Sequence, residues 1–145
     1  MIDLQRLQDG SLVTVDSAPI IYFLEDHPIY APYFRPLFEQ IDSGRLQAII
    51  SPVTVAEVVA GPLGQANELL AERYYQALTS GSNWSVQDLT AEISFLAARI
   101  RTRYRLRLPD AIQVATAVYT GSSALLTHDR DFRNVDEMLI LGLDK

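Results

Sequence analysis

Several short apolar runs in this sequence end at, or just before, an acidic residue, and this restricts the fold more than any other feature. LVTVD leads to Asp16, AIISPVTVAE to Glu57, RLPDAIQVA contains Asp110, and ALLTHDRDF contains Asp129 and Asp131. A carboxylate beside a buried strand is unfavourable unless a cation or a hydrogen-bond donor accompanies it. A hard divalent cation such as Mg²⁺ or Mn²⁺ is the simplest partner for several bare carboxylates.

The spacing of apolar residues predicts strands that alternate with helices. The expected strands are SLVTVD, LQAIIS, NWSVQ, SALLT and MLILGL, and the expected helices cover 18–25, 28–43, 52–61, 64–80, 89–104 and a stretch that starts at Pro109. This alternation is typical of a parallel sheet covered on both faces. We therefore expect one α/β domain over residues 1–145, with a central parallel sheet of four or five strands.

Three details of this assignment can be compared directly with a structure. Gly61 is expected to end the helix that starts at Pro52, since glycine is common just beyond a helix. The apolar face of helix 64–80 is assigned to Leu69, Leu70, Tyr74 and Leu78. The apolar face of the helix after Pro109 is assigned to Ala111, Val114, Ala115 and Val118.

The composition of the chain argues against several classes of function. The chain has no cysteine, which excludes disulfides and Cys-based zinc sites and fits a reducing cytoplasm. Its histidines, His27 and His128, lie far apart and lack the HExxH spacing of a zinc site. We see no secretory signal, and no apolar stretch reaches the ~18 residues of a membrane span. The net charge of −6 argues against a broadly basic nucleic-acid-binding surface.

A local basic strip nevertheless interrupts this acidic chain. Five of the eleven arginines fall within ARIRTRYRLR, namely Arg99, Arg101, Arg103, Arg105 and Arg107. They could be the solvated end of a helix, where cations suit the helix dipole. They could equally hold the phosphates of a nucleic acid or contact a partner.

The acids also have structural explanations. Asp16 could cap the next helix, Asp110 could be a first-turn acid, and Asp131 could cap a turn around Phe132. Against this, ligands of open parallel sheets bind beyond the carboxyl ends of the strands. Asp16, as the last residue of the first strand, and Asp129, just after the fourth, would meet at that edge if these strands are neighbours.

Glu57 depends on where its helix begins. With Thr54 it matches the T-x-x-E pattern of a capping box. However, Pro52 is best placed at the first helical position with Ser51 as the cap. That start moves Glu57 into the second turn, where it cannot reach back to a cap.

Four segments in order resemble the motifs of the PIN domain family. They are VDSAPIIYFLE, SPVTVAEVVAG, LRLPDAIQVATA and LLTHDRDF, and together they span nearly the whole chain. The resemblance implies a PIN-like three-layer α/β/α fold. It implies metal-site roles for Asp16, Glu57, Asp110 and Asp129, a secondary role for Asp131, and supporting hydroxyl roles for Ser17 and Thr127. Two departures are Ala18, where the family often has Asn, and a polar segment, 3–11, before the first strand.

The resemblance also implies a function. Short members of the family resemble VapC toxins, which are Mg²⁺- or Mn²⁺-dependent endoribonucleases of type II toxin–antitoxin pairs, typically homodimeric and neutralised by a small antitoxin. Asp16, Asp110 and Asp129 would bind the metal, with Glu57 as a further ligand or a water-positioning base. The arginine strip would hold flanking phosphates of the RNA substrate.

Two other functions are compatible with an α/β fold of this kind. A non-catalytic PIN-like module would keep the fold and bind RNA or protein without cleaving. A metal-dependent phosphatase of the haloacid dehalogenase type would need D-x-D after the first strand, but Asp16 is followed by Ser17 and Ala18. The complete set of acids favours the nuclease over both.

Overall fold

A five-stranded, wholly parallel sheet in the order β3-β2-β1-β4-β5 forms the centre of the molecule. It is seen in a computed structural model that describes residues 2–143. The strands are β1 (Ser11–Val15), β2 (Leu46–Ile50), β3 (Trp84–Val86), β4 (Ala124–Leu126) and β5 (Ile140–Leu141). The predicted parallel α/β sheet is therefore confirmed, with all five strands present.

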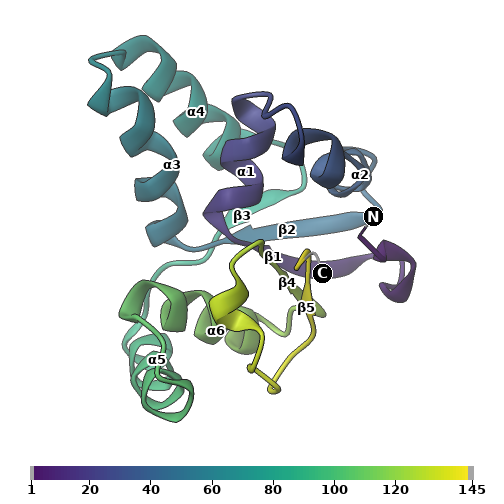
Figure 1. Cartoon of the computed structure of the whole chain (residues 1–145), viewed down its shortest axis with the longest axis vertical. Helices are drawn as coiled ribbons and strands as arrows, with labels where there is room; N and C mark the ends of the chain where they lie inside the picture. The colour runs from purple at the N-terminus through teal and green to yellow at the C-terminus, as the bar shows by residue number, and fades with distance from the viewer. Residues whose placement is uncertain (1, 144–145) are drawn as a thin grey trace.

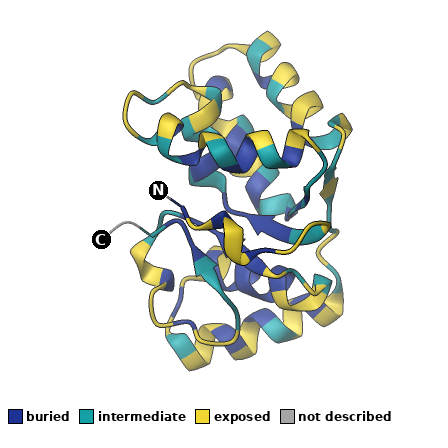
Figure 2. Cartoon of the chain, turned by 90° about the vertical axis from the view of Figure 1, so that its right-hand side faces the viewer, coloured by how far each residue is buried: buried dark blue, intermediate teal, exposed yellow. Residues whose placement is uncertain are grey.

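Six α-helices cover the two faces of this sheet. They are α1 (Ser17–Leu24), α2 (Tyr30–Asp42), α3 (Pro52–Gly64), α4 (Glu68–Ser80), α5 (Ala91–Tyr104) and α6 (Leu108–Thr120). Helices α1–α4 lie on one side of the sheet and α5 and α6 on the other, which gives three layers (Figure 1). Each side has its own apolar cluster, one around Phe34 and Ile50 and the other around Ile100 and Phe132. Figure 2 shows the buried strands between two layers of helices whose outer faces are exposed.

The order of the strands reverses at β1. The chain proceeds from β1 outward through β2 to β3, and then crosses to β4 on the other side of β1. Parallel pairing matches Val15 with Leu126, so β1 and β4 end side by side. The backbone N–H of Asp16 extends this ladder by donating to the carbonyl of Leu126 at 2.9 Å. The sequences that follow these two strands therefore share one edge of the sheet, the usual ligand position in such folds.

Two helix boundaries differ by three or more residues from those predicted. Helix α3 continues through Gly61 and Pro62 to Gly64, and the backbone turns left-handed only at Ala66, with φ of 58°. Helix α4 begins at Glu68, after the Asn67 side chain caps it by accepting from the Leu70 N–H. The prediction that α3 ends at Gly61 was wrong, because a glycine inside a helix costs only about 1 kcal/mol and does not by itself end the helix.

Two apolar stripes were also partly wrong. Leu69 is 64% exposed, because Ala71, two positions further along α4 and so on the opposite side, is the residue that faces the core. In α6, Val118 is 38% exposed, whereas every residue from Asp110 to Ala117 is buried. This helix packs against both α5 and the sheet, so its buried surface is wider than a single stripe.

The polar segment before β1 is attached to the fold by one arginine. It forms a short 3₁₀ helix, η1 (Leu4–Arg6), whose Leu4 is buried. The Arg45 guanidinium donates to the carbonyls of Leu4 and Leu7 and forms an ion pair with Asp9 at 2.8 Å. Arg45 therefore supplies a donor to the Leu7 carbonyl and a second donor to the Leu4 carbonyl, which also accepts from the Leu7 N–H. Within residues 2–143, no helix has the length and apolar character needed to cross a bilayer.

We expect Arg45→Ala to lower the free energy of unfolding by about 1–3 kcal/mol, the usual cost of leaving a partly buried acceptor, here the Leu7 carbonyl, unpaired. Urea denaturation followed by circular dichroism measures this change. Asp9→Ala is the matched control, because it removes only an exposed ion pair, worth about 0.2–1 kcal/mol. Equal losses for the two variants would contradict the role given to Arg45.

Candidate metal centre

Three carboxylates meet at the edge of the sheet where β1 and β4 end. One oxygen each from Asp110, Asp129 and Asp131 lies within 4.8 Å of the other two. Asp110 belongs to the first turn of α6, and Asp129 caps a short 3₁₀ helix, η2 (Arg130–Phe132), by accepting from the Asp131 N–H at 2.9 Å. This cap turns the backbone so that both acids of the HDRD segment reach Asp110. The family resemblance implied only a secondary role for Asp131, whereas in the structure its carboxylate lies with the other two.

Asp16 lies next to this trio and is held by hydrogen bonds. Its Oδ1 accepts from the Ser17 N–H at 2.9 Å and from Gln113 Nε2 at 2.9 Å. Its Oδ2 accepts from the Thr127 hydroxyl at 2.8 Å. The same hydroxyl accepts from the Asp129 N–H at 3.0 Å, so Thr127 joins Asp16 to the trio. Ser17 thus contacts Asp16 through its backbone and not through the hydroxyl that the sequence suggested.

The position of Glu57 is less clearly that of a metal ligand. Helix α3 begins as predicted, with Ser51 as the cap and Pro52 at the first position, and the Ser51 hydroxyl accepts from the Thr54 N–H. The capping box of Thr54 with Glu57 is therefore not formed. Glu57 is exposed in the second turn of α3 and is not one of the three acids that converge among residues 2–143.

Burial and charge repulsion both act on the carboxyl of Asp110. Burial raises the pKa of this carboxyl, and the negative charges of Asp129 and Asp16 raise it further, while Arg107 lowers it. The Arg107 guanidinium lies 3.4 Å from Asp110 Oδ2 but is itself 74% exposed. One exposed arginine offsets the negative charge of four neighbouring carboxylates only in part. Closely spaced carboxylate oxygens with unbalanced charge fit a hard divalent cation such as Mg²⁺ or Mn²⁺.

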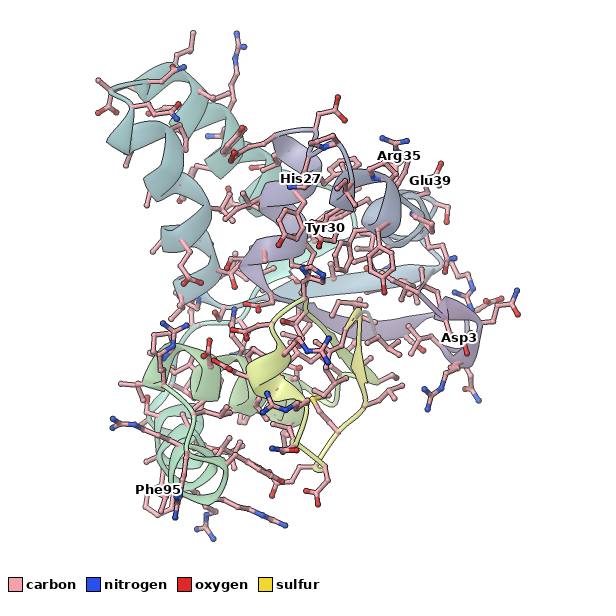
Figure 3. The ribbon with its side chains drawn as sticks, viewed as in Figure 1. Asp3, His27, Tyr30, Arg35, Glu39 and Phe95 are labelled. Atoms are coloured by element: carbon pink, nitrogen blue, oxygen red, sulfur yellow. The ribbon has the colours of Figure 1, made fainter. Side chains whose placement is uncertain are left out.

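The basic strip does not act as one surface. Arg101 and Arg103 lie in the last turn of α5, where cations suit the helix dipole, and Arg105 ends that helix in a left-handed conformation. Arg103 forms ion pairs with Asp136 and Glu137, and Arg99 lies over the Phe95 ring. Figure 3 shows Phe95 on the outer side of α5, at the edge of the molecule. Arg107 is the member of the strip that reaches the acids.

Sequence reasoning missed one polar residue behind the site, Gln113, and considered Ser51 and Thr54 only as helix caps. Gln113 is buried in α6 and binds the side chains of Asp16, Ser51 and Thr54. The available signal was a glutamine among the apolar residues of DAIQVATA, since a buried amide needs partners. The sequence could not name those partners, because they come from β1 and α3.

A mostly apolar hollow lies away from these acids. It has a volume of about 290 Å³ and is lined by Phe23, Phe38 and Trp84, among others, between α1, α2, α4 and β3. A separate aromatic group joins α1, α2 and the end of β4, where the Tyr22 hydroxyl lies 3.1 Å from His128 Nδ1. His27 and Tyr30 stack within it, 4.9 Å apart, and both face the viewer in Figure 3. These contacts hold His128, the residue before Asp129, against α1 and α2.

We expect Asp110→Asn to raise the midpoint of thermal unfolding in EDTA at pH 7. The raised pKa of Asp110 means that folding disfavours its ionised form, so wild type loses stability as pH rises above 3.8 towards the folded-state value. The advantage of the variant should therefore grow over that range and then level off. Calorimetry at several pH values measures it.

Asp136→Asn is the control with the opposite sign. The Tyr104 hydroxyl donates to Asp136 and lowers its pKa, so this carboxylate stabilises the fold at neutral pH and stops doing so as pH falls through its folded-state pKa. The control variant should therefore have a lower midpoint of thermal unfolding than wild type at pH 7. A lower midpoint for Asp110→Asn in EDTA would contradict the repulsion described above.

Comparisons with known proteins agree with this geometry. The PIN domain model matches residues 13–138. No curated protein matches the chain. Among solved structures, VapBC2 from Rickettsia felis bound to a promoter DNA fragment is similar with a TM-score of 0.71 and 15% identity, over 89% of this chain and 96% of that one.

Two further structures have similar values. A toxin–antitoxin complex from Klebsiella pneumoniae has a TM-score of 0.68 and 22% identity, over 88% of this chain and 95% of that one. VapC20 of Mycobacterium tuberculosis, described as a sarcin–ricin loop cleaving toxin, has a TM-score of 0.69 and 16% identity, over 83% and 92%. At these identities the likeness concerns the fold, whereas the family model covers most of the sequence. The chain therefore belongs to the PIN domain family.

Proposed function

We propose that this protein is a metal-dependent endoribonuclease that hydrolyses RNA phosphodiester bonds, with residues 1–145 acting as a single nuclease domain. The observation that carries the proposal is the convergence of Asp110, Asp129 and Asp131 within 4.8 Å, beside a firmly held Asp16. Membership of the PIN domain family supports it. A solved relative in fold, VapC20, is described as cleaving the sarcin–ricin loop.

The acids would hold Mg²⁺ or Mn²⁺, with Asp110, Asp129 and Asp131 as the trio and Asp16 at its side. Such an ion lowers the pKa of a bound water and balances the charge of the scissile phosphate. The chain itself supplies rigidity: Thr127 fixes Asp16 relative to Asp129, and the η2 cap fixes Asp129 relative to Asp131. Glu57 remains in the proposal as a further ligand or a water-positioning base from α3.

The same proposal assigns the substrate contacts and partners. Arg107, next to the acids, would hold a phosphate of the RNA, and Arg99, Arg101, Arg103 and Arg105 would contribute to flanking contacts. One solved relative in fold is described as a toxin–antitoxin complex, and two others are described as VapBC. We therefore propose that this chain is the toxin of such a pair, acts in the cytoplasm, forms a homodimer and is neutralised by a cognate antitoxin.

A non-catalytic module that binds RNA or protein is the alternative. It would retain the fold and could even bind a metal, so activity must separate the two. Incubating the purified protein with a mixed RNA pool, with Mg²⁺ and separately with EDTA, and mapping the cleavage ends distinguishes them. Cuts that appear only with the metal support the nuclease.

We expect Asp129→Asn to reduce RNA cleavage by more than the roughly 10–100-fold that losing an outer-shell partner of a metal costs. The substitution removes a charge from the trio but leaves an oxygen that can accept from the Asp131 N–H, so the fold should persist. Asp42→Asn, an exposed acid at the end of α2, is the matched control and should cleave like wild type. Wild-type cleavage by a folded Asp129→Asn protein would refute the mechanism.

Arg107→Gln should change two measured quantities in opposite directions. The guanidinium pairs with Asp110 and so competes with a cation for that carboxylate. Its removal should tighten Mn²⁺ binding a few-fold, a modest gain because exposed ion pairs are weak. It should also raise the KM for RNA, because a phosphate contact is lost. Calorimetric titration and cleavage kinetics test these changes, and weaker Mn²⁺ binding would contradict the competition.

A further inference from the structure

Gln113 is the most completely bonded buried polar side chain near the acids. It lies in α6, one turn after Asp110, and is only 1% exposed. Its Nε2 donates to Asp16 Oδ1 at 2.9 Å and to the Thr54 hydroxyl at 2.6 Å. Its Oε1 accepts from the Ser51 hydroxyl at 2.6 Å. Asp110 and Gln113 are three positions apart and so lie on the same side of α6. Asp110 belongs to the candidate metal centre, and Gln113 bonds Asp16.

These partners fix the orientation of the amide. A glutamine has one acceptor oxygen and two N–H donors, and all three are used here. The reverse orientation would place the amide oxygen against the Asp16 carboxylate, two acceptors with no proton between them. The Ser51 hydroxyl is committed as well, since it donates to Gln113 and accepts from the Thr54 N–H. The beginning of α3 therefore determines which atom Gln113 directs at Asp16.

This arrangement leaves Asp16 with one free direction. Oδ1 already accepts from Ser17 and Gln113, whereas within residues 2–143 Oδ2 accepts from Thr127 alone. A carboxylate oxygen has about two acceptor positions, so the remaining capacity of Asp16 lies on Oδ2. Without Gln113, repulsion from the neighbouring Asp110 would favour rotation of the Asp16 carboxylate away from the trio.

We propose that Gln113 is a positioning residue, which holds the Asp16 carboxylate beside the acidic trio and thereby sets the affinity of the centre for a divalent cation. This inference rests on the proposed metal-dependent function. A purely structural glutamine would only join α6 to α3, and removing it would lower stability without changing metal affinity. The two roles therefore predict different titrations.

The test is the dissociation constant of Mn²⁺, measured by calorimetry on folded protein. Gln113→Leu should bind Mn²⁺ about 10–100-fold more weakly than wild type, the usual effect of losing an outer-shell partner. Thr116→Val is the matched control: Thr116 is equally buried on α6, but its hydroxyl donates to the Ile112 carbonyl of the same helix. The control should stay close to wild type. Unchanged Mn²⁺ binding by Gln113→Leu would overturn the proposal.

A second pair of variants tests the positioning role of Gln113 if Gln113→Leu does not fold. Thr54→Val removes the hydroxyl that accepts from Gln113, whereas Thr54→Ser retains one. Weaker Mn²⁺ binding for valine, with recovery for serine, supports the positioning role, and equal binding by both contradicts it. The wild-type titration separates this inference from the function: absence of Mn²⁺ binding by wild type contradicts the proposed nuclease itself.

Discussion

Mutual repulsion of carboxylates at one edge of the sheet is the constraint on which the rest of this structure depends. The parallel pairing of β1 with β4 brings the ends of both strands together, and the Asp16 N–H bond to the Leu126 carbonyl closes that pairing. Asp110, Asp129 and Asp131 converge at the same place from α6 and η2. Folding therefore brings these charges together in a partly buried place, and the raised pKa of Asp110 reports the cost of that burial and of the repulsion.

The chain stabilises its acids in two different ways. Asp16 is surrounded by neutral donors, namely the Ser17 N–H, the Gln113 amide and the Thr127 hydroxyl. Asp110, in contrast, has Arg107 as its cationic neighbour, and the side chain of this arginine is largely exposed to solvent. A fixed acid beside acids that are only partly balanced is what a cation site requires, because the ion then supplies the missing charge at a defined position.

Sequence patterns predicted the fold well, because nearby residues determine where most of its strands and helices begin and end. Alternating strands and helices indicated the parallel sheet, and the Ser51–Pro52 pair marked the start of α3. The errors came from tertiary packing. Helix α6 is buried from Asp110 to Ala117 because α5 and the sheet both cover it, so a single stripe could not describe it. Nothing local indicates that Gln113 bonds residues 59 and 97 positions away.

The candidate site was predictable in its composition but less so in its arrangement. The sequence placed Asp16 and Asp129 at strand ends, which the β1–β4 pairing brings to one edge. It did not predict that Asp131 lies beside Asp110, since the η2 cap that turns this side chain depends on a hydrogen bond across two residues. It treated the arginines as one strip, whereas the end of α5 separates Arg107 from the rest and directs it to Asp110.

Diffraction from crystals grown with Mn²⁺, recorded at an energy where manganese scatters anomalously, tests the central claim most directly. The account predicts an anomalous peak in contact with the carboxylates of Asp110, Asp129 and Asp131, with Asp16 beside it in its present orientation. A fully loaded crystal with no peak at these acids, or with manganese bound only elsewhere, would contradict it.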